Sequence, residues 1–343
     1  MNLITKYRLA KAIRRGLRLI TIQTAIEEGY QRILSKPLTI DGLCDAANYN
    51  PSMKSKVKLF LDALASYAVV RQEDGSDGVT HYRWSRRSGH AEEAKDIKTK
   101  TDELLSRKYC GELLRGQHIE LARNWRRMVR GEPEDELTRA REMIAISIGL
   151  RAELMQEGRK RALGIIGIKP GTNAIDIGCG AGTSTIQLAE AVGPQGHVSG
   201  VEVDENLYSE AVVRYQELSS SYRKSIAEID FVMADIRDEA LRALGGDFDA
   251  ATTFLFWHYI KEDDYVKVLM NINEGLKQNG RIGGIQPMHL RSDDVFDGEW
   301  AGTAISEFTY YPFIQKFRNT LKECGFGKFK FSKMVLTFRA DKD

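Results

Sequence analysis

The stretch NAIDIGCGAGTSTIQLAEAV, residues 173–192, sets three closely spaced glycines between an apolar run and a segment with helical periodicity. Asn173 to Ile177 is predicted to be a short buried strand, and residues 186–192 begin an amphipathic helix. The glycines between them are Gly178, Gly180 and Gly182. They leave the turn without side chains, so a ligand can lie against bare backbone. A helix beginning near Thr183 directs free N–H groups and its positive dipole end at this turn, which suits a phosphate or a carboxylate.

The spacing of these glycines differs from two common nucleotide-binding turns. In the dinucleotide signature GxGxxG, the third glycine lets helix and strand pack closely, but here Thr183 occupies that position. A P-loop is excluded because no Gly-Lys-Ser/Thr sequence follows. The turn therefore favours an adenosine that carries a short zwitterionic chain.

Three acidic residues end successive predicted strands in this part of the chain. Asp176 ends the first strand, Glu202 ends the second, and Asp235 ends the third. The ends of parallel strands meet at one edge of the sheet, where open α/β folds bind ligands. Glu202 lies 20 residues beyond Gly182, where a carboxylate can accept both ribose hydroxyls. The Asp235 side chain, or the backbone N–H that follows it, can meet the edge of an adenine.

These motifs resemble those of the class I S-adenosylmethionine-dependent methyltransferases. DIGCGAG is similar to their first motif, VEV contains their ribose acid, and ADIRD contains their adenine-edge acid. The resemblance implies an α/β fold with a Rossmann-like seven-stranded sheet whose last strand is antiparallel, S-adenosyl-L-methionine as cofactor, and no metal. The implied cofactor-binding residues are Asp176, Gly178, Cys179, Gly180, Gly182, Glu202, Val203, Asp235 and Ile236.

The pattern of the second half of the chain is consistent with this fold. Residues 166–343 alternate predicted strands and helices, which indicates a mostly parallel sheet covered on both faces. The final two strands, FGKFKFS and KMVLTFRA, have almost no connection between them and must form an antiparallel hairpin.

The first half is predicted to be helical. Residues 1–88 contain helical patterns at 24–34, 40–49 and 54–70 followed by a β-hairpin, which is the order of a winged-helix domain. Such domains bind DNA in regulators and mediate dimerisation in enzymes. Residues 89–165 are predicted to be a helical linker, with the clearest helix at 141–163.

This order of domains resembles the dimeric small-molecule O-methyltransferases. The resemblance implies a homodimer formed through the N-terminal domain, and it places His258 on the histidine that serves that family as general base. The family segment reads about LHDWSDE, whereas here Tyr259 replaces the aspartate and Ile260 the tryptophan. A structural or substrate-orienting role for His258 therefore stays open. Glu299 and Glu307 are both candidates for the acid that holds this histidine in the family.

The segment from Met288 to Pro312 has no helix or strand pattern, and long loops of this kind are commonly functional lids. We expect it to wall the acceptor pocket. The predicted acceptor-binding residues are Trp257, Met288, Trp300, Phe308 and Tyr311, with Tyr310 a further aromatic candidate. The alternative is ordinary packing against the linker helices, and Trp257 could equally flank the adenine.

Composition restricts the partners and the compartment. The net charge of +2 provides no overall basic field for nucleic acid, although six basic residues in the first 18 predict a basic surface helix that could contact RNA or anionic lipid. The four cysteines are isolated, and no apolar run approaches the roughly 18 residues that span a bilayer. The N-terminus also lacks a signal-peptide pattern, so we expect a cytoplasmic protein.

The sequence thus predicts an enzyme that methylates an oxygen or carbon of a small aromatic or lipid-like acceptor. Two alternatives stay open: an RNA or other nucleic-acid methyltransferase, and a winged-helix DNA-binding regulator that senses the cofactor. Against the former, TFLFWHY stands where amino-methylating enzymes carry [DNS]PP[YFW].

Overall fold

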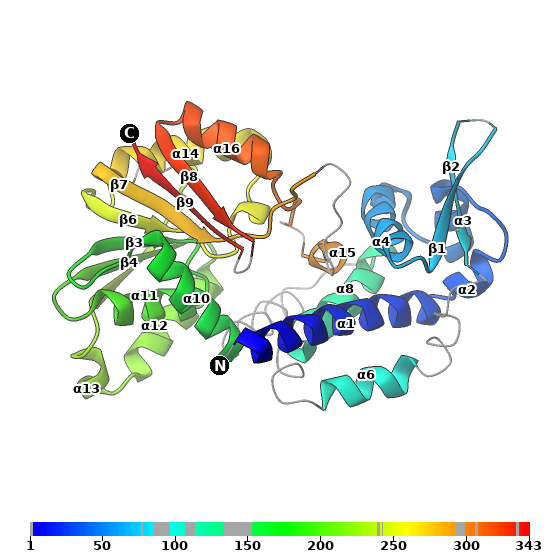
Figure 1. The fold of residues 1–343 in the computed structure, drawn as a ribbon, viewed down its shortest axis with the longest axis horizontal. Coiled ribbons are helices and arrows are strands. Elements are labelled where there is room, and N and C mark those ends of the chain that lie inside the picture. The colour runs from blue at the N-terminus through cyan, green and yellow to red at the C-terminus, as the bar shows by residue number, and fades with distance from the viewer. Residues whose placement is uncertain are drawn as a thin grey trace. The chain divides into compact units, whose positions relative to one another are not determined.

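The computed structural model describes residues 3–76, 78–85, 97–106, 114–132, 153–238, 241, 243–291, 299–305, 308–333 and 336–343. Its contacts divide the chain into two compact units (Figure 1). The N-terminal unit comprises Met1–Ala152 and Asp293–Phe308, and the second unit comprises Glu153–Ser292 and Thr309–Asp343.

The second unit is built on one seven-stranded sheet. Its strands are β3 (Asn173–Ile177), β4 (His197–Glu202), β5 (Glu228–Met233), β6 (Phe248–Thr252), β7 (Leu276–Ile285), β8 (Phe326–Ser332) and β9 (Thr337–Lys342). They lie in the order β5-β4-β3-β6-β7-β9-β8. Strands β3 to β7 pair in parallel, and β9 pairs antiparallel with both β7 and β8. The predicted seven-stranded sheet with an antiparallel last strand is confirmed.

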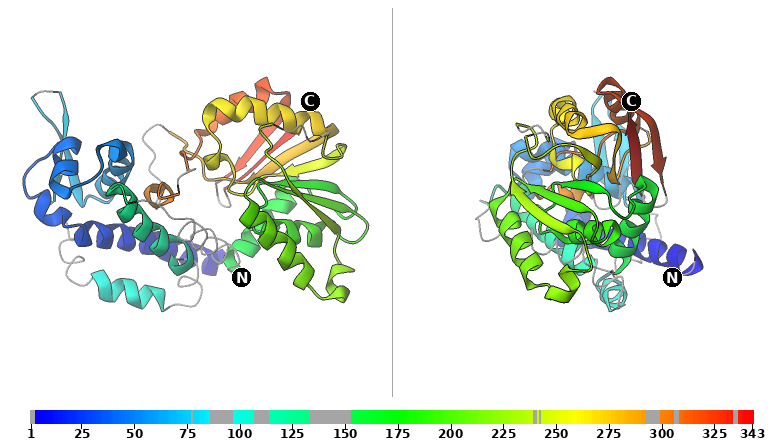
Figure 2. Two further views of the ribbon diagram at one scale, coloured as in Figure 1. Left: turned by 180° about the vertical axis from the view of Figure 1, so that it is seen from behind. Right: turned by 90° about the vertical axis from the view of Figure 1, so that its left-hand side faces the viewer.

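Helices cover both faces of this sheet (Figures 1 and 2). They are α10 (Glu153–Ile166), α11 (Thr183–Val192), α12 (Glu205–Glu217), α13 (Ser220–Arg223), α14 (Tyr265–Gly275) and α16 (Ile314–Glu323), with the short 3-10 turns η3 (Trp257–Tyr259) and η4 (Glu262–Asp264). Because side chains alternate along β3, Ala174 packs with α10 and α11 while Ile175 and Ile177 pack with α14 and α16. Burial of each isoleucine contributes about 1.5–3 kcal/mol.

Helix α10 differs from the sequence prediction, which placed it in the linker. Its Leu163 and Ile166 are buried, and it packs on β7, β9 and α11 within the second unit. The contact with β7 is close because Gly283 has no side chain there: a Cβ would lie 2.6 Å from Cγ1 of Ile166. The N-terminal part of the predicted helix 141–163 falls outside the described residues.

The described part of the N-terminal unit is mostly helical, as predicted. Its elements are α1 (Leu3–Glu27), α2 (Tyr30–Ile33), α3 (Ile40–Ala47), η1 (Pro51–Met53), α4 (Lys54–Ser66), β1 (Val70–Asp74), β2 (Thr80–Trp84), α6 (Ile97–Leu105), η2 (Leu114–Ile119), α8 (Glu120–Val129) and α15 (Glu299–Gly302). Thr39 caps α3 by accepting a hydrogen bond from the Gly42 N–H at 3.1 Å. Strands β1 and β2 form the expected antiparallel hairpin. Its classification as a winged helix stays a prediction.

Aromatic rings fill the core of the N-terminal unit. Phe60 lies 4.5 Å from Trp125 and 4.6 Å from Trp300 between ring centroids. Trp300 belongs to α15 and donates a hydrogen bond from Nε1 to Oγ1 of Thr21 at 3.0 Å. The segment that contains α15 therefore folds with the N-terminal unit, although it lies between β7 and α16 in the sequence.

No helix among the described residues is long and apolar enough to cross a membrane.

Candidate cofactor site and active site

The glycine turn joins β3 to α11 and adopts the backbone conformation that its sequence requires. Gly178, Gly180 and Gly182 have φ angles of 66°, 54° and 76°, in the region that favours glycine. A Cβ on Gly180 would meet nothing within 4 Å, so this part of the turn is open. A Cβ on Gly182 would lie 3.0 Å from Cβ of Ala211 in α12. Gly182 thus provides the close packing that a dinucleotide site obtains from a glycine one position later.

Asp176 holds the turn in place from inside the protein. Its side chain is fully buried, and its carboxylate accepts hydrogen bonds from the hydroxyls of Ser184 and Thr185 at 2.8 Å and of Thr252 at 2.9 Å. Burial raises the pKa of Asp176, and these three bonds oppose that rise. The carboxylate therefore ties the end of β3 to the first turn of α11 and to β6.

Glu202, at the end of β4, braces the same turn from the neighbouring strand. Its carboxylate accepts from the N–H of Gly180 at 2.8 Å, of Val203 at 2.8 Å and of Asp204 at 3.0 Å. Burial raises the pKa of Glu202, opposed by the three backbone donors. Cys179 lies within the turn as a buried free thiol, and burial raises its pKa well above the usual value. This thiol is not activated as a nucleophile.

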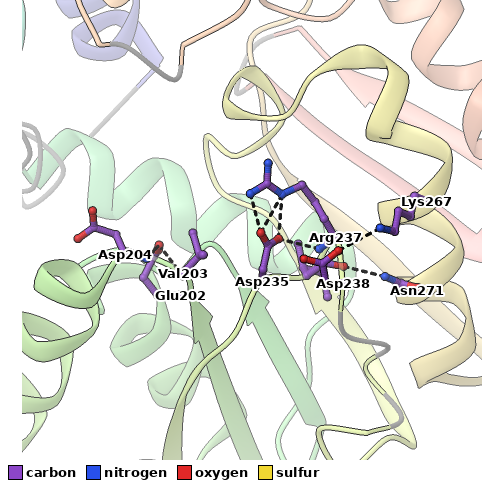
Figure 3. A network of polar contacts seen from close by, with 9 residues as sticks. Glu202, Val203, Asp204, Asp235, Arg237, Asp238, Lys267 and Asn271 are labelled. Atoms are coloured by element: carbon purple, nitrogen blue, oxygen red, sulfur yellow. Dashed lines mark hydrogen bonds and ion pairs between the residues drawn. The ribbon is translucent and has the colours of Figure 1, made fainter.

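Asp235 follows β5 and forms an ion pair with Arg237 (Figure 3). Arg237 donates from Nε at 2.9 Å and Nη2 at 2.5 Å to the two carboxylate oxygens, and its backbone N–H donates to Oδ1 at 2.9 Å. The hydrogen bond from the Arg237 side chain lowers the pKa of Asp235, which stays ionised. Ile236 is buried, and its carbonyl accepts a hydrogen bond from Asn271 of α14 at 2.8 Å.

Two apolar side chains at this sheet edge are exposed. Val203 is 58% exposed and Met233 is 55% exposed. Met233 lies directly opposite Glu202 in the pairing of β4 with β5, so both side chains belong to adjacent strand ends. The sequence pointed to Val203 but missed Met233. Only the fact that β5 is an edge strand, which is a property of the sheet order, marks Met233 as available to a ligand.

His258 lies in η3, after the end of β6, and is buried with 5% exposure. Its carbonyl accepts hydrogen bonds from the N–H and hydroxyl of Thr309 at 2.7 and 3.0 Å. The ring packs against Tyr259 and meets Tyr311 edge-on, with centroids 4.3 and 5.4 Å away. Burial lowers the pKa of His258 to about 3, so the imidazole is neutral.

Gln286 is the polar partner of this histidine. It is fully buried directly after β7, with its Nε2 3.1 Å from Nδ1 of His258. No pattern in the sequence marked Gln286, because a single glutamine after a strand matches no catalytic motif.

The other predicted acceptor-binding residues are divided between the two units. Tyr311 lies beside His258, whereas Trp257 and Met288 are buried in the core of the second unit. Trp300 and Phe308 are buried in the N-terminal unit, as is Glu299. Glu307 lies outside the described residues. The acceptor-binding role of these residues stays a prediction.

The residues at the sheet edge fit S-adenosylmethionine. Gly180 leaves bare backbone open, and the N-cap of α11 is a glycine with no side-chain cap. Two carboxylates and two exposed apolar side chains follow along the neighbouring strand ends. The zwitterionic chain of this cofactor needs hydrogen-bond donors, its ribose needs hydrogen-bond acceptors, and its adenine needs apolar surface. This sheet order and this arrangement of residues resemble those of class I S-adenosylmethionine-dependent methyltransferases.

Comparison with known proteins finds the same resemblance. Residues 174–280 match the family described as "Methyltransferase domain". Demethylmenaquinone methyltransferase of Staphylococcus aureus (strain JH9) is 31% identical over 124 residues, which are 36% of this chain and 46% of that protein. The chain thus spans about half the length of the curated relatives it matches.

Solved structures share the fold across the whole chain. DszA carbon methyltransferase is 13% identical with a TM-score of 0.68, covering 99% of this chain and 92% of the other. An O-methyltransferase family protein from Burkholderia thailandensis is 13% identical with a TM-score of 0.52, covering 100% and 98%.

Proposed function

We propose that this protein transfers the methyl group of S-adenosylmethionine to an oxygen or carbon atom of a small aromatic or lipid-like acceptor. The observation that carries the proposal is the open glycine turn together with Glu202 and Asp235 at the carboxyl edge of the sheet. The choice of oxygen or carbon is supported by the fold that the chain shares with DszA carbon methyltransferase and with an O-methyltransferase family protein. The name of one relative gives demethylmenaquinone as its acceptor.

We assign the parts of the cofactor to the described residues as follows. The glycine turn and the N-terminus of α11 hold the amino acid end, Glu202 holds the ribose, and Asp235 with the Ile236 N–H meets the adenine. A carboxylate offers about four acceptor positions. Three of those on Glu202 receive backbone N–H groups, so we expect one ribose hydroxyl to bond to it rather than two.

S-adenosylmethionine supplies a methyl group on a positively charged sulfur, which an electron-rich atom can displace directly. The contribution of the protein is alignment of the two reactants, and orientation can supply about 7–11 kcal/mol of the barrier. His258 lies after β6 with Tyr311 against its ring, and we place the acceptor on this side of the unit.

We further propose that two copies associate through residues 1–88, which light scattering of the purified protein would test.

Calorimetry with S-adenosylhomocysteine tests the cofactor site. Asp235→Asn removes the ionised acceptor, and loss of a hydrogen bond to a charged group weakens binding by about 10- to 100-fold. Asp238→Asn is the matched control, because Asp238 lies on the same loop and pairs with Lys267 at 3.0 Å but is exposed (Figure 3). We expect its affinity to equal that of the unchanged protein. No uptake of S-adenosylhomocysteine by folded protein, together with tight binding of a nicotinamide nucleotide, would refute the proposal.

The acceptor class is tested by supplying radiolabelled S-adenosylmethionine with phenols, 1,3-dicarbonyl compounds, RNA and duplex DNA in parallel. We expect label only in the small molecules. Label in a nucleic acid would replace the proposed acceptor, and DNA binding without turnover would indicate a regulator.

A further inference from the structure

The amide of Gln286 has only one possible orientation. Its Oε1 lies 3.1 Å from the backbone nitrogen of Trp257, and a backbone N–H can only donate. Its Nε2 lies 3.1 Å from the carbonyl oxygen of Pro287, and a carbonyl can only accept. Exchanging the amide oxygen and nitrogen would turn both contacts into repulsions. The backbone of Gln286 is held as well, because its N–H donates to the Leu336 carbonyl at 2.8 Å.

This orientation determines which nitrogen of His258 carries the hydrogen. The Gln286 Nε2 faces Nδ1 of His258 at 3.1 Å, and an amide nitrogen has no lone pair to offer. Nδ1 must therefore be the acceptor. A neutral imidazole has one N–H, so its hydrogen lies on Nε2. A general base that acts through Nε2 needs the opposite tautomer, in which Nδ1 carries the hydrogen and donates to a carboxylate or carbonyl.

We infer that Gln286 is a positioning residue that holds His258 in the Nε2–H tautomer, so that the ring meets the acceptor as a hydrogen-bond donor and not as a base. The inference rests on the proposed function and specifies its substrate class. Any group that meets Nε2 must itself accept a hydrogen bond. Because Nε2 then has no lone pair with which to remove a proton, the acceptor is a compound that binds already deprotonated, such as a phenolate or the enolate of a 1,3-dicarbonyl, with an oxygen bonded to the Nε2–H.

The methyl transfer then balances without a proton on His258. The electron pair of the acceptor anion forms the bond to the methyl carbon, and the carbon–sulfur bond breaks with its pair going to sulfur. The anion and the sulfonium are both neutralised. Acceptors with high pKa values, which need a base to ionise them, are expected to be poor substrates.

The tautomer is measured directly on the unchanged protein by ¹⁵N-resolved NMR of the histidine rings, because a protonated and an unprotonated ring nitrogen differ in shift and coupling. The chain has six histidines. The His258 signals are assigned as those that disappear in His258→Gln. If that variant does not fold, they are the signals that remain when each of the other five histidines is substituted in turn. We expect a hydrogen on Nε2 and none on Nδ1. A hydrogen on Nδ1 overturns the inference.

Gln286→Glu tests the consequence for the reaction. The carboxylate would accept from Nδ1–H, which frees the Nε2 lone pair and raises the ring pKa. We expect kcat on a pre-ionised phenol to fall about tenfold, the worth of one hydrogen bond, with the KM for S-adenosylmethionine unchanged. The pH–rate profile should gain an ionisation absent from the unchanged protein. Among the described residues, titratable groups whose contacts with this ring or its neighbour are resolved include Tyr259, Tyr311 and, against Tyr311, His289.

The matched control is Gln278→Glu, the same change on an exposed residue of β7, which should leave kcat and the pH profile unaltered. An unchanged pH profile and kcat in folded Gln286→Glu would refute the positioning role. If Gln286→Glu does not fold, the NMR measurement of the His258 tautomer in the unchanged protein decides whether the inference holds. Failure of S-adenosylhomocysteine to bind would refute the proposed function itself, whereas normal binding with a hydrogen on Nδ1 refutes only this inference.

Discussion

At the scale of single residues, the strand-end carboxylates are equivalent in sequence but not in the structure. Asp176 and Glu202 are buried, and burial raises their pKa values although each accepts three hydrogen bonds. Asp235 lies nearer the surface, and Arg237 lowers its pKa. We therefore expect Asp235 to be ionised and paired with Arg237, while Asp176 mainly shapes the turn.

A fourth carboxylate supports the fold of the N-terminal unit. Burial raises the pKa of Glu28, but hydrogen bonds from Arg126, Tyr49 and Arg130 outweigh this, and the pKa is lowered below 4.5. Because the folded pKa lies below the unfolded one, Glu28 contributes stability above about pH 4.5, and that contribution is lost as pH falls through the folded value.

We predict that Glu28→Gln lowers the free energy of unfolding by about 3 kcal/mol at pH 7, near the lower end for a broken buried pair because both arginines are partly exposed. Glu27→Gln is the control, since Glu27 pairs with the same Arg126 from a site with 40% side-chain exposure, and should change stability by less than about 1 kcal/mol. Urea denaturation at pH 7 and pH 4 checks both values. Equal losses in the two variants would contradict the assignment.

The sequence made some of the site residues predictable. Glu202 and Asp235 followed from their positions after apolar strands, because strand ends converge on one edge in a parallel sheet. His258 was predicted from its resemblance to a family segment. Gln286 was not predictable, because its role depends on the Trp257 N–H and the Pro287 carbonyl, which only the folded chain brings to its amide.

At the scale of elements, the glycine turn combines two separable functions. Gly180 leaves space for a ligand, whereas Gly182 allows α11 to approach α12. We predict that Gly182→Ala destabilises the fold by about 2–5 kcal/mol, from the positive φ and the contact with Ala211 together.

Gly180→Ala incurs only the penalty of the positive φ, about 1–2 kcal/mol. Its Cβ would occupy the open face of the turn, so we expect a larger loss of S-adenosylhomocysteine affinity than of stability. Denaturation and calorimetry on both variants test this contrast. If Gly180→Ala proves the less stable variant, or if it binds normally, the division of roles is wrong.

The elements predicted from sequence differ from the structure where the backbone turns for tertiary reasons. The apolar run FDAATTFLF, residues 248–256, has the pattern of one continuous strand, but β6 ends at Thr252, and Leu255 has a positive φ of 55°. The helical pattern at 24–34 is interrupted by Gly29, whose φ is 76°. Helix α10 showed an apolar face in the sequence, but periodicity does not tell which sheet or helix that face covers.

At the scale of the whole molecule, the segment expected to wall the acceptor pocket is divided between the two units. Tyr311 lies beside His258, whereas Trp300 lies in the aromatic core of the N-terminal unit. The sequence could not distinguish these two cases, because a loop that lines a pocket and a loop that packs into a core can have the same aromatic composition.

We predict that Trp300→Ala destabilises the N-terminal unit by about 3–5 kcal/mol through the cavity it leaves. Trp300→Phe keeps most of the ring and loses chiefly the hydrogen bond to Thr21, which contributes about 1 kcal/mol. Hydrogen exchange should quicken in α1, α4 and α8 of the alanine variant, while β3, β4 and β6 keep their protection. Faster exchange confined to the sheet would show that α15 belongs with the other unit.

The placement of α15 also affects how such a chain can be recombined. Because Asp293–Phe308 folds with Met1–Ala152, a single crossover between the two units would leave a Trp-bearing segment without its hydrophobic surroundings. A functional chimera needs breakpoints after residues 152, 292 and 308. Exchange of N-terminal units between related chains therefore has to transfer two separate stretches of coding sequence together, which restricts the evolutionary and engineering routes open to this architecture.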